Sequence, residues 1–287
     1  MKPGSALLVT KANAIVEASY RLTLQEQRLV LFCVGQVDSR RPLEEQRTFT
    51  VEATPFRETF DLSPEKVYEE LKDAAVRLFE RKVTISDAQN GQETLLRWVS
   101  MIRYQNRRGR VVLNFAPEML PFISALKDRF TSYPLESIAR LSSTFAIRLF
   151  EVLAQYANLG RRQVTVEQLR RWLDCVDSYP RFSEFERWVV APAVAQLNER
   201  TELRVRYDKG KVGRQVSHFE FVIGRAPSAP KPKPAAAVAK PAEPPAAERK
   251  AAERQEWEAH MRRLGLDPAA LMAQAGKPPS RGNDEGN

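Results

Sequence analysis

Four polar residues cluster at the start of a predicted helix, in the stretch SYPRFSEFERW. Arg181 and Arg187 could each donate two hydrogen bonds to the O6 and N7 acceptors of guanine, and Glu184 could accept from the amino group of cytosine. Ser183 lies between them and completes the group. Such residues at the N-terminal end of a helix are typical of a recognition helix in the major groove of DNA. We therefore predict that these four residues read base edges.

The same stretch has an apolar side that must face a protein core. Ser183 with Glu186 three residues later predicts a capping box at the helix start, and Pro192 predicts the loss of one backbone hydrogen bond and a slight bend. Glu184 has an equally good alternative role, because a carboxylate also stabilises the N-terminus of a helix. The residues expected to anchor the helix are Phe182, Phe185, Val189, Val194 and Leu197.

A basic hairpin is predicted directly after this helix. Arg204 and Arg206 alternate with apolar residues in LRVRY, which gives one apolar and one basic strand face. Lys209, Lys211 and Arg214 crowd the predicted loop DKGKVGR. Cations at such a tip could contact DNA phosphates, which position a protein without reading sequence. The alternative is a solvated edge strand whose charges prevent strand pairing.

A second basic hairpin lies earlier in the chain. Its cations are Arg103, Arg107, Arg108 and Arg110. The predicted helix before it carries Lys66 and Lys72, but acidic residues offset them, namely Glu65, Glu69, Glu70 and Asp73. Because acidic side chains are repelled by phosphates, we expect this region to contact the DNA backbone at most, or to make protein contacts.

Helix signals and strand patterns define a first module over residues 1–136. Thr23 and Glu26 form a predicted capping box, and Ser63 followed by Pro64 predicts another helix start. The expected helices cover about 24–37, 56–60 and 64–79, and the expected strands cover 82–86, 95–105 and 110–115. Three helices followed by a hairpin is the order of a winged helix.

Residues 137–225 repeat this order. Ser142 or Ser143 is expected to cap a helix that ends near residues 158–160, and Thr165 with Gln168 predicts a capping box after a short strand. The recognition helix and the strands 203–207 and 215–223 follow. The predicted fold class is therefore α+β, with two tandem winged-helix (helix-turn-helix) domains.

Composition changes sharply after Arg225. Residues 226–287 are rich in Pro and Ala, and few are large and apolar, so we expect a disordered tail. One short helix is predicted near 247–264, with Trp257, Met261 and Leu264 on one face.

Charge and composition favour a polyanion partner and argue against an enzyme. Residues 137–225 hold 15 Lys and Arg against 10 Asp and Glu, within a formal net charge of +9. The two histidines, His218 and His260, cannot build a zinc site, and Cys33 and Cys175 are expected to be buried thiols. We expect no cofactor, no metal and no catalytic residue. No apolar run reaches the length of a membrane span, so we predict a cytoplasmic protein.

Several segments, in order, resemble one protein family. They include TKANAIVEASYRLTLQEQRLVLFCVGQVD, LKDAAVRLFERKVTI, FTSYPLESIARLSSTFAIRLFEVLAQY, SYPRFSEFERWVVAPAVAQLNERTEL and GRQVSHFEF. Together they span about residues 9–224. They resemble the iteron-binding plasmid replication initiators, the RepE-like tandem winged-helix family. The Pro- and Ala-rich tail departs from the family.

The resemblance implies a function that the residues alone do not. Such initiators bind repeated double-stranded sites (iterons) at a plasmid origin as monomers, help to melt the adjacent DNA, and recruit host DnaA and the replicative helicase. As homodimers, joined largely through the first module, they repress their own gene. Arg181 and Arg187 match the positions of arginines that read bases in the family, and residues 213–215 match its phosphate-contacting wing.

Two alternatives remain open at this point. A transcriptional repressor could use the same two modules without initiator activity, and repeated direct sites beside the gene would favour the initiator over it. A nicking replication enzyme is a poor third candidate, because it needs a His-rich metal site that two distant histidines cannot build. The sequence also has no P-loop, so we expect no helicase or ATPase activity of its own.

Overall fold

The computed structural model describes residues 7–43, 48–87, 91–105 and 109–226. These residues belong to one compact unit. The predicted tail lies outside the described residues except for Ala226, and so does the predicted helix at 247–264.

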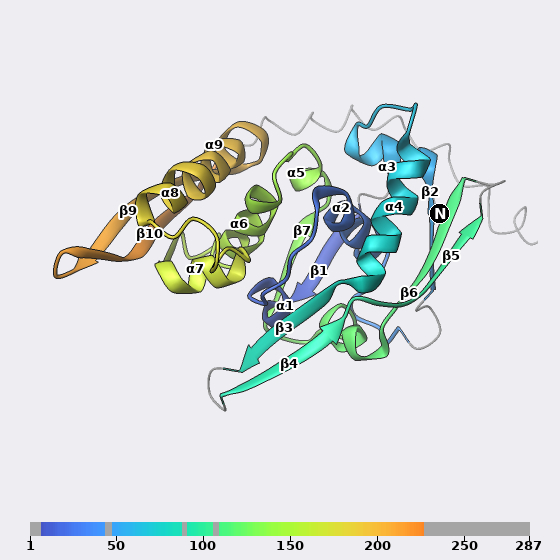
Figure 1. Ribbon diagram of the computed structural model, residues 1–287, viewed down its shortest axis with the longest axis horizontal. Helices are drawn as coiled ribbons and strands as arrows, with labels where there is room; N and C mark the ends of the chain where they lie inside the picture. The colour runs from blue at the N-terminus through green and yellow to red at the C-terminus, as the bar shows by residue number, and fades with distance from the viewer. Residues whose placement is uncertain (1–6, 44–47, 88–90, 106–108, 227–287) are drawn as a thin grey trace, which may run out of the picture. The chain divides into compact units, whose positions relative to one another are not determined.

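The first module combines three main helices with short antiparallel sheets (Figure 1). Strands β2, β6 and β5 form a sheet in that order, β3 pairs with β4, and β1 pairs with β7. The element bounds are β1 (Leu8–Ala12), α1 (Asn13–Val16), α2 (Leu24–Val34), β2 (Thr48–Glu52), α3 (Ala53–Phe60), α4 (Val67–Glu80), β3 (Lys82–Asp87), β4 (Gln92–Arg97), β5 (Val99–Gln105), β6 (Arg110–Phe115), a 3-10 helix (Pro117–Phe122) and β7 (Phe130–Pro134).

Local sequence signals explain most of these elements. The capping box of Thr23 and Glu26 is present at the start of α2, and the helix ends three residues before the predicted Val37. α3 begins at Ala53, earlier than predicted. The predicted apolar stripe of α4 is confirmed, because five of its residues are buried against the core: Val67, Leu71, Ala74, Ala75 and Leu78.

Two predictions for this module are wrong. Ser63 and Pro64 do not start α4, because the chain forms a turn there and the helix begins at Val67 without a side-chain cap. The predicted strand 95–105 is broken at Trp98, which is completely buried and packs edge-on against Tyr20 with ring centroids 5.0 Å apart. Burying this large ring ends β4 and lets the chain change partner, so that β4 pairs with β3 and β5 with β6.

The second module repeats the winged-helix order, which confirms the α+β tandem winged-helix fold (Figure 1). Its sheet has the strand order β8-β10-β9, and all neighbours are antiparallel. The bounds are α5 (Glu136–Ala139), α6 (Thr144–Ala154), β8 (Arg161–Thr165), α7 (Val166–Trp172), α8 (Phe182–Phe185), a π-helical turn (Glu186–Val190), α9 (Ala191–Arg200), β9 (Leu203–Val212) and β10 (Gln215–Arg225).

Helix caps in this module follow the sequence only in part. The capping box of Thr165 and Gln168 is present at α7. α6 begins directly after Ser143 as predicted, but neither serine caps it with its side chain. Ser142 instead hydrogen-bonds Gln196 of α9 through its backbone N–H, at 3.1 Å. Tertiary packing thus replaces the expected local cap.

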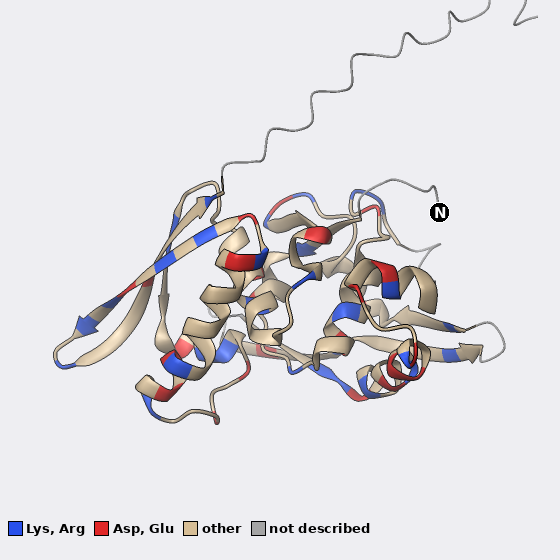
Figure 2. Cartoon of the chain, turned by 90° about the horizontal axis from the view of Figure 1, so that it is seen from above, with Lys and Arg blue, Asp and Glu red and all other residues tan. Residues whose placement is uncertain are grey.

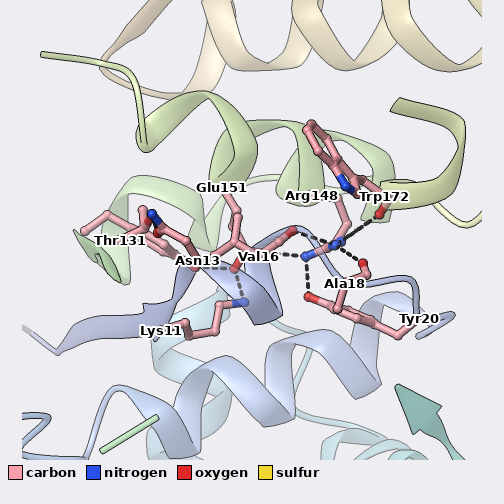
Figure 3. A network of polar contacts seen from close by, with 10 residues as sticks. Lys11, Asn13, Val16, Ala18, Tyr20, Thr131, Arg148, Glu151 and Trp172 are labelled. Carbon is pink, nitrogen blue, oxygen red and sulfur yellow. Dashed lines mark hydrogen bonds and ion pairs between the residues drawn. The ribbon is translucent and has the colours of Figure 1, made fainter. Parts of the chain in front are cut away.

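A buried network of charges joins β1 of the first module to α6 (Figure 3). Glu151 is fully buried between the ammonium of Lys11 and the guanidinium of Arg148, which is 3.1 Å from its carboxylate. Arg148 also donates to the carbonyls of Val16 and Ala18 at 2.9 and 2.8 Å. A cation that satisfies backbone carbonyls of the α1 region fixes α6 against the N-terminal segment.

The network is sensitive to the loss of any member, because buried charges are stable only when they are paired and hydrogen-bonded. Burial alone raises the pKa of Glu151, but Lys11 and Arg148 overcome this effect, and the pKa lies below the ordinary value of a glutamate. The carboxylate is therefore held in its charged form.

We predict that Glu151→Gln lowers the free energy of unfolding by about 3 to 5 kcal/mol, because it leaves two buried cations without their anion. Glu199→Gln is the matched control: among the described residues Glu199 pairs only with Arg200, and its side chain is 69% exposed, so a loss below about 1 kcal/mol is expected. Urea unfolding at pH 7 measures both. Equal losses in the two variants would contradict the role of the network.

The pH dependence provides a second readout. Because the folded-state pKa of Glu151 is depressed, its stabilisation is present above the pKa of an unfolded glutamate, about 4.3, and is lost as pH falls through the folded-state pKa. The difference in stability between the wild type and Glu151→Gln should therefore shrink in acid.

Candidate nucleic-acid interface

The predicted recognition helix is one continuous helical segment, formed by α8, the π-helical turn and α9 (Figure 1). The predicted capping box of Ser183 and Glu186 is wrong, because Arg181 is the N-cap residue and no side chain caps the helix. Glu186 instead points to the hairpin that follows. The Glu186 carboxylate therefore accepts hydrogen bonds from β9 instead of from the backbone at the start of its own helix.

Pro192 does not simply bend the helix. It lies in the first turn of α9, directly after the wide π-helical turn Glu186–Val190. Proline has no N–H and its ring clashes with the carbonyl four residues earlier in an α-helix, and a wider turn directly before it gives that carbonyl more room. The turn leaves two adjacent residues buried, Val189 and Val190, and two adjacent residues exposed, Arg187 and Trp188.

The inner face of the helix packs on the wing strands through aromatic rings. Phe182 stacks on Phe219 of β10 with centroids 5.6 Å apart, and Phe185 and Tyr207 also contact Phe219. The predicted anchoring side is confirmed: Phe182 is half-buried, and the other four predicted residues are buried. This packing orients the opposite face towards solvent.

Arg170 of α7 holds the start of the recognition helix in place. Its guanidinium donates to the carbonyl of Ser178 at 3.0 Å and to that of Arg181 at 3.4 Å, and it lies 4.5 Å from the ring centroid of Phe185. The sequence alone does not predict this role, because basic residues such as Arg170 and Arg171 are common in the last turn of a helix.

Two further contacts connect the recognition helix to β9. The carboxylate of Glu186 accepts from Lys209 at 2.9 Å and from the hydroxyl of Tyr207 at 3.2 Å. Burial, together with this carboxylate, raises the pKa of Tyr207 to about 12. The amide of Asn198 exchanges two hydrogen bonds with the backbone of Val205, at 2.9 and 2.6 Å. The helix and the hairpin therefore behave as one rigid surface.

The four candidate base-reading residues are brought together on the outer face of the first turns. Arg181 is 81% exposed and makes only a loose ion pair with Glu184, at 3.8 Å. Ser183 and Arg187 are exposed, and Glu184 is partly exposed. Arg187 has no carboxylate partner in the part of the chain that the structure describes; its guanidinium lies against the ring of Trp188. Two guanidinium groups are thus available to an anionic ligand.

The wing is a long antiparallel hairpin with Lys and Arg along it (Figure 2). The strands extend through most of the predicted loop, and only Gly213 and Arg214 form the turn, where Gly213 has a φ of +63°. The predicted alternation of β9 is confirmed: Leu203 and Val205 are buried and Tyr207 half-buried.

The wing cations differ in availability. Arg204 donates to the carbonyls of Thr201 and Leu203, both at 2.8 Å, and Lys209 is paired with Glu186. Three other cations are exposed and have no hydrogen bond or ion pair within the described ranges: Arg206, Lys211 and Arg214. These three are the cations that the wing can offer to phosphate without losing an internal contact.

In the first module the four predicted cations that the structure describes do not form one surface. Arg110 is paired with Glu52 at 3.0 Å, and Lys72 lies over the ring of Tyr104. Arg103 is exposed and precedes Tyr104 in β5. Because neighbouring side chains of a strand point to opposite faces, Arg103 lies on the face of the sheet away from Tyr104 and Lys72. Lys66 is exposed just before α4. Arg107 and Arg108 lie outside the described residues.

The exposed side of α4 differs in character from that of the recognition helix. Val76 and Phe79 are partly exposed and line a shallow groove with Ile102 and Tyr104 of β5, the edge strand of its sheet. Asp73 on the same helix lies close enough to Tyr104 to raise its pKa further, in addition to the effect of burial. This face is apolar at its centre and carries charges of both signs around it: Asp73 and Glu80, with Lys72 over Tyr104 and Arg97 over Phe79.

The two cysteines and His218 have ordinary structural environments in the described part of the chain. Cys33 and Cys175 are buried and unpaired, and burial raises the pKa of the Cys175 thiol to about 12. His218 hydrogen-bonds Ser217 and Glu220, and its side chain is 18% exposed. Within the described ranges, no three His, Cys, Asp or Glu residues are placed to hold a metal ion, and no helix is long and apolar enough to cross a membrane.

Two family models match the chain. Residues 8–154 match the family described as "Initiator Replication protein, WH1", and residues 165–223 match "Initiator Rep protein, WH2". The chain belongs to the family of plasmid replication initiators. It is therefore a DNA-binding protein with two winged-helix domains.

Relatives with curated names are consistent with this assignment. A "Replication initiation protein" of Escherichia coli is 24% identical over 212 residues, covering 71% of this chain and 66% of the relative. The "PI protein" of Escherichia coli is 27% identical over 247 residues, covering 74% and 81%. The Pi initiator protein in its crystal structure with iteron DNA has the same fold, with a TM-score of 0.67, 23% identity, and coverage of 77% and 98%.

We predict that Arg170→Lys lowers the free energy of unfolding by about 1 to 2 kcal/mol, because a lysine cannot donate to both carbonyls and stack on Phe185 at once. Arg171→Lys is the neighbouring control, since Arg171 is exposed and its one ion pair within the described ranges is with Glu167 along the helix; a loss below about 0.5 kcal/mol is expected. Urea unfolding compares them. A similar loss in both would show that Arg170 does not position the helix.

Proposed function

We propose that this initiator binds iterons, the repeated double-stranded sites of its origin, and reads them with the second module. Arg181 and Arg187 contact guanines, and Ser183 and Glu184 contact neighbouring bases. Arg206, Lys211 and Arg214 contact phosphates, and Arg204 and Lys209 add positive charge beside them. The observation that carries this proposal is a recognition helix with two exposed arginines, fixed to a basic hairpin, in a chain of the initiator family.

The first module has a different proposed role. Its candidate contacts to the DNA backbone are Lys66, Lys72, Arg103, Arg107, Arg108 and Arg110. The apolar groove of α4 and the edge strand β5 support a protein contact there rather than base readout. We propose that the chain exists as a monomer and a homodimer in equilibrium, with the dimer joined through this module, residues 1–136, while residues 137–225 bind the sites.

Origin opening, recruitment of host proteins and repression are proposed because the chain resembles the initiator family, and not from the geometry of the site. Bound monomers promote opening of the origin and recruit host DnaA and the replicative helicase, while the dimer represses the gene of the initiator. Catalysis is not part of the proposal, because the residues at the recognition surface are donors and acceptors suited to base edges rather than a nucleophile and base pair. We place the protein in the cytoplasm, where its DNA and host partners are found.

A DNase footprint over the DNA that flanks the gene tests the function. Evenly spaced direct repeats, about 20 to 22 base pairs apart and so about two helical turns, support the initiator. A single protected inverted repeat at the promoter would support repression alone. Coating without any discrete site would contradict sequence readout.

We predict that Arg181→Ala and Arg187→Ala each weaken binding to the protected site by about 5- to 100-fold and leave random-sequence binding almost unchanged, because each bidentate contact discriminates one base. Lys211→Ala should weaken both kinds of binding about equally and reduce the slope of log K against log salt by about one unit. Fluorescence anisotropy at several salt concentrations measures all three. Equal losses on specific and random DNA for the two arginine variants would overturn their assignment.

A further inference from the structure

A large apolar side chain is exposed beside the two arginines of the recognition helix. Trp188 lies in the π-helical turn and is 57% exposed, although tryptophan is a residue that proteins mostly bury. It neighbours Arg187 on the outer face, while Val189 and Val190 fill the core. The wide turn that precedes Pro192 thus presents an aromatic ring on the surface that faces the ligand.

The ring and the neighbouring guanidinium already contact each other. The guanidinium carbon of Arg187 lies 4.9 Å from the ring centroid of Trp188. Such stacking contributes about 0.5 to 1 kcal/mol at an exposed site and restricts the rotamers of the arginine. Arg187 therefore has a preferred position before it binds, with the indole beside it.

The major groove of DNA offers one apolar group that a ring such as that of Trp188 can contact. The 5-methyl group of thymine is the apolar group that base pairs present there, whereas the guanine edge presents two acceptors suited to an arginine. An aromatic ring next to an arginine fork therefore matches a thymine next to a guanine. The cations around Trp188 also favour a polyanion over a neutral protein surface at this place.

We propose that Trp188 is a further specificity-determining residue, which packs on the 5-methyl group of a thymine adjacent to the guanine that Arg187 contacts. This inference rests on the proposed function of the second module. A Trp188 contact would let the helix recognise one more base pair, through its methyl group rather than through hydrogen bonds.

The test uses duplexes of the footprinted site in which single thymines are replaced by uracil, which removes only the methyl group. The wild type should lose about 3- to 10-fold in affinity at one or two positions, because one buried methyl group is lost. Trp188→Ala should bind the thymine duplex as weakly as the wild type binds the uracil duplex, and should show no further uracil effect. Trp188→Phe should retain part of the effect.

Lys211→Ala is the matched control, since it should bind more weakly overall and keep the full uracil effect. Trp188→Ala should have wild-type stability in urea and wild-type affinity for random duplex. A uracil effect that persists unchanged in Trp188→Ala would overturn the inference. Binding to one separated strand of the footprinted site is measured as well. A loss in Trp188→Ala that appears only with this single strand, and not with the duplex, would also overturn the inference, because it would indicate stacking on unpaired bases.

The proposed function of the second module and the role of Trp188 can fail separately. A missing footprint, or equal losses on specific and random DNA for Arg181→Ala, would overturn the proposed function of the module. If those experiments succeed and Trp188→Ala alone shows no change in specificity, only the role of Trp188 is wrong.

Discussion

The structure depends first on the burial of one carboxylate between two cations. Glu151 of α6 is fully buried with Lys11 of β1 and Arg148, and Arg148 in turn satisfies carbonyls of the N-terminal segment and of Trp172. A buried ion costs several kcal/mol unless all of its neighbours are in place. The observed position of α6 against the N-terminal segment is therefore stable, and a shifted position would leave buried charges unpaired. Arg162 adds a second link, because it pairs with Glu17 and lies over the rings of Tyr156 and Trp172.

From this fixed helix the rest of the second module is built outward. α7 follows β8 and carries Arg170, which holds the chain that leads into the recognition helix. The helix packs on Phe219 and is connected to β9 through Glu186 and Asn198. Each contact removes a degree of freedom before DNA arrives. Preorganisation of this kind reduces the entropy lost on binding.

The two winged helices share an order of elements but present different surfaces. In the second module the third helix presents arginines, and its glutamate at position 186 is neutralised by the wing. In the first module the third helix presents Val76 and Phe79, with charges of both signs around them, beside an open strand edge. A shared fold thus supports two kinds of surface, because the side chains on the exposed face determine the partner.

Much of the architecture was determined by the sequence itself. Periodic apolar residues and local caps such as Thr23 with Glu26 and Thr165 with Gln168 identified most helices, because their partners lie within one helical turn. The exposed arginines of the recognition helix followed from the same periodicity, as did the basic face of β9. These features depend on residues close together in the sequence, so the sequence alone predicts them.

Other features were decided only by the tertiary structure. Ser183 and Glu186 had the spacing of a capping box, but Tyr207 and Lys209 offered Glu186 a better set of donors. The break at Trp98 and the positioning role of Arg170 likewise depend on residues far away or on another helix. So does the difference between the paired Arg204 and Lys209 and the exposed Lys211. Long-range partners set these outcomes, because a side chain forms whichever contact lowers its free energy most in the folded chain, and sequence spacing alone does not identify that partner.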